Sequence, residues 1–199
     1  MRRSATYEIL CSSARPIGDG GVAAGGALRI LPTVTGTPLP TQREWRSALL
    51  GSSFGSRIPT TAIPLAVDAM GGVLIELDGV AIVFRPLECF LEQHGDRSDW
   101  AELVLTIDFA MSSWLRDWRL EHRRDLPIDH VVVPLFLDAE GGPPASPRHY
   151  QAVEMHQALR RFADLRDEHM ARRQHLGGLH QRINSLRRVR RRMGQMARS

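Results

Sequence analysis

The residue types best suited to chemistry meet where Asp129 is followed directly by His130, with Asp138 and Glu140 further along the chain. A carboxylate next to an imidazole can orient the ring for general base catalysis. Adjacent residues of a strand point to opposite faces, and on that reasoning we expect Asp129 and His130 not to touch. An enzyme with a site near His130 is therefore an alternative interpretation only, and we assign no catalytic residue.

Two further patterns resemble motifs that bind a cofactor or a metal ion, and both are incomplete. Residues 18–23, GDGGVA, match the letters of a dinucleotide fingerprint, but Arg15-Pro16 precedes them and Gly25-Gly26 follows, where a strand and a helix are required. We interpret this stretch as a flexible loop. His149 and His156 are seven residues apart, but the carboxylate and histidine pattern of a zinc site does not accompany them. We predict neither a cofactor nor a metal.

Arginine has the most uneven distribution of any residue type. All 26 basic residues are arginine, and residues 147–199 hold 13 of them against four acidic residues, a net charge of +9, whereas residues 1–146 carry −5. Such a segment attracts polyanions by counterion release, with little regard to base sequence. We predict nucleic acid as the ligand, bound by arginines near the end of this arm: Arg182, Arg187, Arg188, Arg190, Arg191, Arg192 and Arg198.

A hydrophobic heptad repeat runs through the same arm. With Met155 at an a position, nine of the twelve a and d positions are apolar, which favours a supercoiled helix pair. A helical hairpin that turns at Gly177-Gly178 is the alternative, and from Leu176 onward the pattern also fits a helix on a membrane surface or in a groove. The predicted seam, which would make a homo-oligomer or a subunit of a larger complex, is Met155, Phe162, Leu165, Leu176, Leu179, Ile183, Leu186 and Met193.

Residues 1–146 are predicted to form an α+β domain. Its core would be a small mixed or antiparallel sheet with a central hairpin that turns at Asp78-Gly79, packed on a long amphipathic helix. Pro64 would push one strand to the edge of the sheet. The predicted strands are residues 7–12, 27–31, 60–67, 73–77, 80–84 and 131–137.

Three helices are predicted in this domain. Thr41 and Glu44 form a capping box that begins a helix over residues 42–50, and Pro86 begins a short helix to residue 93. The longest helix is capped by Ser98 and Asp99 and runs to about residue 122. Of its three tryptophans, we expect Trp118 to reach the surface, beside three arginines: Arg119, Arg123 and Arg124.

Composition limits the remaining possibilities. The chain of 199 residues, with 43% hydrophobic content, suits one core with an appendage, and residues 138–146 read as the linker between them. An apolar run long enough for a membrane span is missing, and two distant cysteines, Cys11 and Cys89, suit a reducing compartment. We therefore expect a cytoplasmic protein of bacterial or phage type.

These observations favour a non-enzymatic interaction protein whose arm binds a polyanion, most of all nucleic acid. The alternative from another class is a structural or adaptor subunit of a secretion, phage or plasmid-transfer assembly. In that case the arm would be a coiled coil that binds an acidic protein surface.

Overall fold

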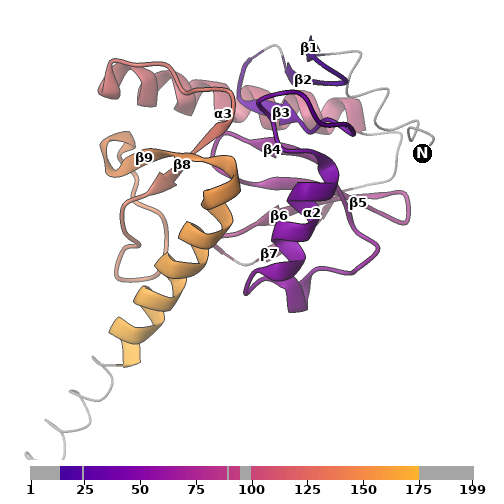
Figure 1. The fold of residues 1–199 in the computed structure, drawn as a ribbon. Helices are drawn as coiled ribbons and strands as arrows, with labels where there is room; N and C mark the ends of the chain where they lie inside the picture. Colours follow the sequence, from indigo (N-terminus) through magenta and orange to yellow (C-terminus); the bar gives the residue numbers. More distant parts are fainter. Residues whose placement is uncertain (1–13, 24, 89, 95–99, 175–199) are drawn as a thin grey trace, which may run out of the picture.

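The computed structural model describes residues 14–23, 25–88, 90–94 and 100–174, and it shows a seven-stranded antiparallel sheet with helices on both faces (Figure 1). Each strand pairs with the strand that precedes and follows it in the sequence, so the sheet is a meander. The expected α+β class is confirmed. The strands are β1 (Ala14–Ile17), β2 (Gly20–Ala23), β3 (Leu28–Ile30), β4 (Ile63–Asp68), β5 (Val73–Leu77), β6 (Val80–Arg85) and β7 (Phe90–His94).

The β5–β6 hairpin forms as predicted. Asp78 and Gly79 both have positive φ, 52° and 85°, and Leu77 pairs with Val80 across the turn. This is the geometry of a type I′ turn, whose twist matches that of the strands it joins. The hairpin contributes the fifth and sixth of the seven strands and supplies side chains to both faces.

Three expectations about the sheet are wrong. β4 is the fourth of the seven strands rather than an edge strand, and it accommodates Pro64 because the pairing with β5 shifts register between Pro64 and Ala66. Residues 18–23 are not a loop, since they complete the β1–β2 hairpin. Residues 90–94 form strand β7 rather than part of a helix, because pairing with β6 outweighs a weak local preference for a short helix.

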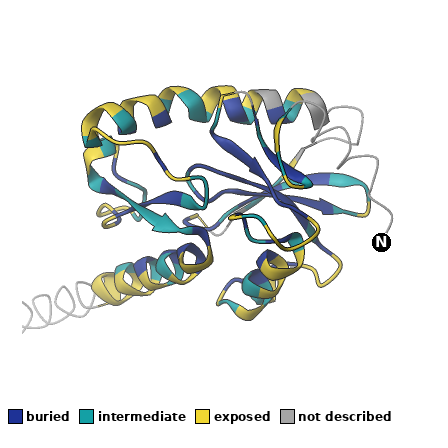
Figure 2. Cartoon of the chain, turned by 45° about the horizontal axis from the view of Figure 1, so that its top comes forward, coloured by how far each residue is buried: buried dark blue, intermediate teal, exposed yellow. Residues whose placement is uncertain are grey.

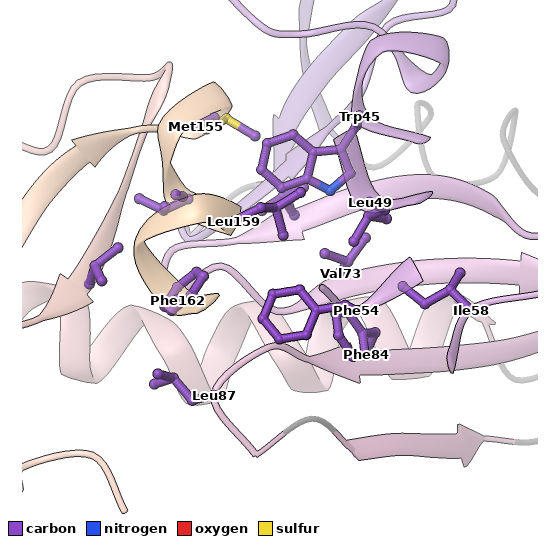
Figure 3. Close-up of a cluster of buried hydrophobic side chains, with 14 of the residues drawn as sticks. Trp45, Leu49, Phe54, Ile58, Val73, Phe84, Leu87, Met155, Leu159 and Phe162 are labelled. Atoms are coloured by element: carbon purple, nitrogen blue, oxygen red, sulfur yellow. The ribbon is translucent and has the colours of Figure 1, made fainter. Parts of the chain in front are cut away.

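One face of the sheet is covered by α2 (Gln42–Gly51) and by a helix that occupies residues 155–174 (Figure 2). The capping box of α2 is confirmed, since the Thr41 side chain accepts from the Glu44 amide and the Glu44 side chain accepts from the Thr41 amide. Figure 3 shows Trp45 of α2 meeting Met155 and Leu159 above the sheet. A short 3₁₀ turn, η1 (Gly55–Arg57), follows α2.

The opposite face is covered by α3 (Trp100–His122), as the long amphipathic stretch predicts. Val104 packs on Leu28 and Ile30 of β3 and on Val83 of β6. The residues expected to cap α3 lie outside the described part of the chain, as does the predicted strand over residues 7–12. The fold is therefore a sheet between two helical layers.

A separate two-stranded ribbon of β8 (His130–Pro134) and β9 (Tyr150–Glu154) lies beside the main sheet, with a 3₁₀ turn, η3 (Pro147–His149), before β9. Its Val132 amide donates to the Ala69 carbonyl just beyond β4, at 2.7 Å. β8 ends at Pro134 rather than continuing to residue 137 as expected. β9 comes from residues that the sequence assigned to the arm, and it pairs with β8 of the preceding segment.

The first seam residues also belong to this core. Met155, Phe162 and Leu165 are all buried against the sheet of their own chain, so they are not available to pair with another helix. The other predicted seam residues, Leu176, Leu179, Ile183, Leu186 and Met193, lie outside the described residues. Among the described helices, none is long and apolar enough to cross a membrane.

Candidate functional site

The arginines predicted to bind nucleic acid, Arg182 to Arg198, lie outside the described residues. The helix over residues 155–174 carries basic side chains that are partly neutralised. Glu168 lies 3.5 Å from Arg161 and 3.7 Å from Arg172. Residues 175–199 contain seven arginines and no acidic residue, so most of the excess charge of the arm belongs to that segment.

A second basic surface lies at the carboxyl end of α3. Four arginines, together with Leu120 and Asp125, line an open hollow of about 400 Å³, which we call the α3 hollow: Arg116, Arg119, Arg123 and Arg124. Spacings of three and four residues place successive side chains on one helix face. Arg123 has φ of 51°, which ends the helix and turns the chain so that Arg124 lies over the Trp118 ring at 5.5 Å.

The Trp118 ring lies under Arg124, and the expectation that Trp118 reaches the surface is wrong. Its side chain is fully buried, with the His122 ring stacked on it at 4.6 Å and its Nε1 donating to the Tyr150 carbonyl. Burial requires Val132 and Tyr150 of the β8–β9 ribbon, which pack against it. The sequence carries no local signal for this contact, because it joins segments more than 30 residues apart.

Ion pairing in the α3 hollow is incomplete. Asp125 lies 3.4 Å from Arg119 Nε, and Asp117 lies 3.6 Å from Arg116, but both carboxylates are largely exposed. Exposed pairs of this kind contribute about 0–1 kcal/mol. Arg119 Nε is nevertheless buried, and in the described part of the chain it has no hydrogen-bond partner.

Beneath the hollow, Arg29 of β3 is a buried cation. Its Nε donates to the Ile128 carbonyl at 2.8 Å and its Nη1 to the Ala27 carbonyl at 3.3 Å. Burial lowers the pKa of Arg29 to about 10; Asp68 opposes that shift, and the positive charge of Arg119 adds to it. The guanidinium groups of Arg29 and Arg119 therefore repel each other.

Asp108 of α3 holds the β2–β3 connection through hydrogen bonds from backbone amides. Its Oδ2 accepts from the Gly25 amide at 2.6 Å, and its Oδ1 accepts from the amides of Ala27 and Leu28 at 3.0 Å each. A Cβ on Gly25 would lie 2.0 Å from Ser112 Oγ, so only glycine allows the chain this close to α3. Gly25 therefore allows the β2–β3 connection to pack closely on α3.

Asp68, at the end of β4, is the buried acid on the other side of Arg29. Its Oδ1 accepts from the amides of Met70 and Gly72 at 2.8 and 2.9 Å. Burial raises the pKa of Asp68, against the lowering influence of these two hydrogen bonds and of Arg85 and Arg29. A cavity of about 40 Å³, lined in part by Arg85 and Glu88, adjoins it and has room for little more than water.

Asp129 and His130 do touch, contrary to expectation. His130 Nδ1 lies 2.7 Å from Asp129 Oδ1. Asp129 belongs to the turn before β8, so the alternation of side chains along a strand does not apply to it. Asp138 instead accepts from the amides of Glu140 and Gly142 in its own loop, and neither of the two hollows described above is lined by His130.

The other candidate ligands stay apart. His149 packs on the Phe136 ring at 5.1 Å, whereas His156 lies 3.2 Å from Glu154. Within the residues that the structure describes, no three histidine, cysteine or acidic side chains are grouped as metal ligands.

Comparison with known proteins gives little to add. No protein-family model matches the chain, and no curated protein sequence does. The chain is similar to the crystal structure of Atu4351 from Agrobacterium tumefaciens, with a TM-score of 0.47 and 11% sequence identity over 82% of this chain and 81% of that one. A likeness of this extent carries no argument about function.

Proposed function

We propose that this protein binds nucleic acid through the arginines at the end of its arm. The observation that supports the proposal is the segregation of charge, since residues 175–199 carry seven arginines without an acidic residue. Phosphate neutralisation by Arg187, Arg188, Arg191 and Arg192 would supply affinity that depends on salt and is nearly independent of base sequence. The protein acts in this view as an interaction protein, with no catalytic residue assigned.

The described structure is compatible with a fixed attachment for such an arm. Ala158, Leu159 and Phe162 are buried against the sheet, so the helix over residues 155–174 is packed on the globular part. A binding segment that continues from a packed helix has less entropy to lose on binding than one attached through a loose linker.

The test is fluorescence anisotropy of labelled oligonucleotides across a salt series, with the full chain. Changing Arg187, Arg188, Arg191 and Arg192 to glutamine should weaken binding to all sequences alike and reduce the salt slope by about 2.8 for single strands, or 0.7 for each lost phosphate contact. The control has the same charge loss at four exposed arginines earlier in the arm: Arg148, Arg160, Arg172 and Arg173. Equal effects of the two variants, or no binding by the full chain, would refute the proposal.

An adaptor role is the second candidate function, and exposed apolar side chains on and beside the helix over residues 155–174 favour it. Leu135, Phe136 and Met170 are all at least one-third exposed, and the Leu135 carbonyl accepts from Arg161 of the C-terminal helix. An adaptor bound through apolar contacts would form a stoichiometric complex with a protein that survives high salt. Nucleic-acid binding through arginine would instead be lost there.

A further inference from the structure

The α3 hollow contains more positive charge than helix stability requires. Arginines near a helix carboxyl end offset the helix dipole, but that effect is confined to the last turn. Arg116 lies six residues before the last residue of α3, His122, so the dipole does not account for it. The lining of the hollow holds four guanidinium groups and one carboxylate, Asp125, whose side chain is 93% exposed.

Two of these guanidinium groups, those of Arg119 and Arg123, have N–H donors without a hydrogen bond to a described residue. Arg119 Nε is buried without a hydrogen bond, and its only ion-pair partner among the described residues is the exposed Asp125 carboxylate, at 3.4 Å. Arg123 has no ion pair or hydrogen bond with any described residue, and it occupies a left-handed position where glycine would be less strained. An oxyanion in the hollow would pair both donors and would also offset the repulsion between Arg119 and Arg29.

We infer that the α3 hollow binds a phosphate group, and that in the complete protein this is a backbone phosphate of the nucleic acid held by the arm. The second half of this inference rests on the proposed function. Guanidinium groups match the geometry of phosphate oxygens and bind them through paired hydrogen bonds. Because the hollow is open to solvent, a phosphate can enter it while it remains part of a polymer.

The hollow lies at the end of the molecule where the helix over residues 155–174 begins, although on the opposite face of the sheet (Figures 1 and 2). The carboxyl end of α3 and the helix over residues 155–174 both lie on the side of the molecule that carries the β8–β9 ribbon (Figures 1 and 2). The Trp118 hydrogen bond to Tyr150 joins α3 to the start of β9, and the C-terminal helix follows directly after β9. The hollow is thus joined through one short ribbon to the first residues of the helix over residues 155–174.

The experiment compares two variants of the full chain with equal loss of charge. One changes Arg116 and Arg123 in the hollow to glutamine. The control changes Arg43 of α2 and Arg57 of η1, which are exposed and do not line the hollow. The probes are a labelled single-stranded oligonucleotide, measured by anisotropy across a salt series, and inorganic pyrophosphate, measured by the shift of the Arg119 Nε–H signal in an NMR titration.

We expect the hollow variant to reduce the salt slope for the oligonucleotide by about 1.4, from two lost phosphate contacts, and to abolish the pyrophosphate shift, whereas the control leaves both near wild type. If the hollow variant equals the control with both probes, the inference is overturned, even where the arm variant still shows that the proposed function holds. If the full chain binds pyrophosphate in the hollow but no oligonucleotide, the proposed function fails and the phosphate site stands as one for a small phosphoester.

Discussion

Replacing Asp108 by alanine should destabilise the fold more than most single substitutions. The carboxylate accepts three backbone amides, from Gly25, Ala27 and Leu28, and the bonds to Ala27 and Leu28 are fully buried. Leaving those two amides unpaired costs about 1–3 kcal/mol each. Relief of the buried charge of Asp108 offsets part of the loss, so we expect a net decrease of about 3–4 kcal/mol in the free energy of unfolding.

Urea denaturation followed by tryptophan fluorescence measures this loss. With an m-value of about 2 kcal/mol/M, the midpoint should fall by about 1.5–2 M. Asparagine at position 108 should cost less, because its carbonyl oxygen can still accept from Ala27 and Leu28, while its amide group opposes the Gly25 amide. Asp117, an exposed acid on the same helix, gives the matched control, and its change to asparagine should cost less than about 0.5 kcal/mol.

Two outcomes would refute this reasoning. A midpoint for the alanine variant within about 0.3 M of wild type would mean that the three hydrogen bonds contribute nothing net to stability. An equal loss for Asp108→Ala and Asp117→Asn would mean that the net charge of α3, and not the bonds to the β2–β3 connection, sets stability. Hydrogen exchange separates these cases, since only loss of the bonds removes protection from the amides of Ala27 and Leu28.

Three further predictions concern a tightly packed glycine, a helix cap and a buried acid. Gly25→Ala should lower the free energy of unfolding by at least about 2 kcal/mol, because the added Cβ would overlap Ser112 Oγ. The control is Gly51→Ala, whose Cβ would have no neighbour within 4 Å and which should be neutral or slightly stabilising in thermal denaturation. Thr41→Ala should cost about 1 kcal/mol in the same assay, by loss of the cap of α2. Burial raises the pKa of Asp68, so the unfolded chain loses this proton at a lower pH than the folded chain, and the contribution of Asp68 to stability falls as pH rises. Asp68→Asn should therefore gain stability relative to wild type as pH rises above about 4, measured by urea midpoints.

Local signals account for the parts of the fold that were predictable. The Asp78-Gly79 turn and the Thr41–Glu44 capping box depend on residues within four positions of each other, and both form as expected. Strand β7 was predicted as helix because its pairing with β6 is a contact that periodicity over eight residues does not reveal. The long helix was recognisable because its apolar stripe persists over six turns.

The buried charges could not have been found from the sequence. Arg29 and Asp108 look like ordinary surface residues until β3 is placed under α3, and the pairing of Asp129 with His130 depends on a turn that lies just before a strand. Part of the α3 hollow could be predicted from the sequence, since Arg119, Arg123 and Arg124 follow Trp118 closely along the chain. The burial of Trp118 could not be predicted, because its partner Tyr150 belongs to a segment that the sequence assigned to the arm.

The burial of Met155, Phe162 and Leu165 favours the interpretation of the arm as a nucleic-acid-binding segment over its interpretation as a coiled coil. With these residues in the core, the seam that is left runs from Leu176 to Met193, which is about two and a half heptads and includes Arg190 at an a position. Stable coiled coils generally need three or four heptads. Two parallel arms would in addition bring together two segments of charge +7, whose repulsion a polyanion removes. If the arm does self-associate, we therefore expect nucleic acid to strengthen that association rather than compete with it.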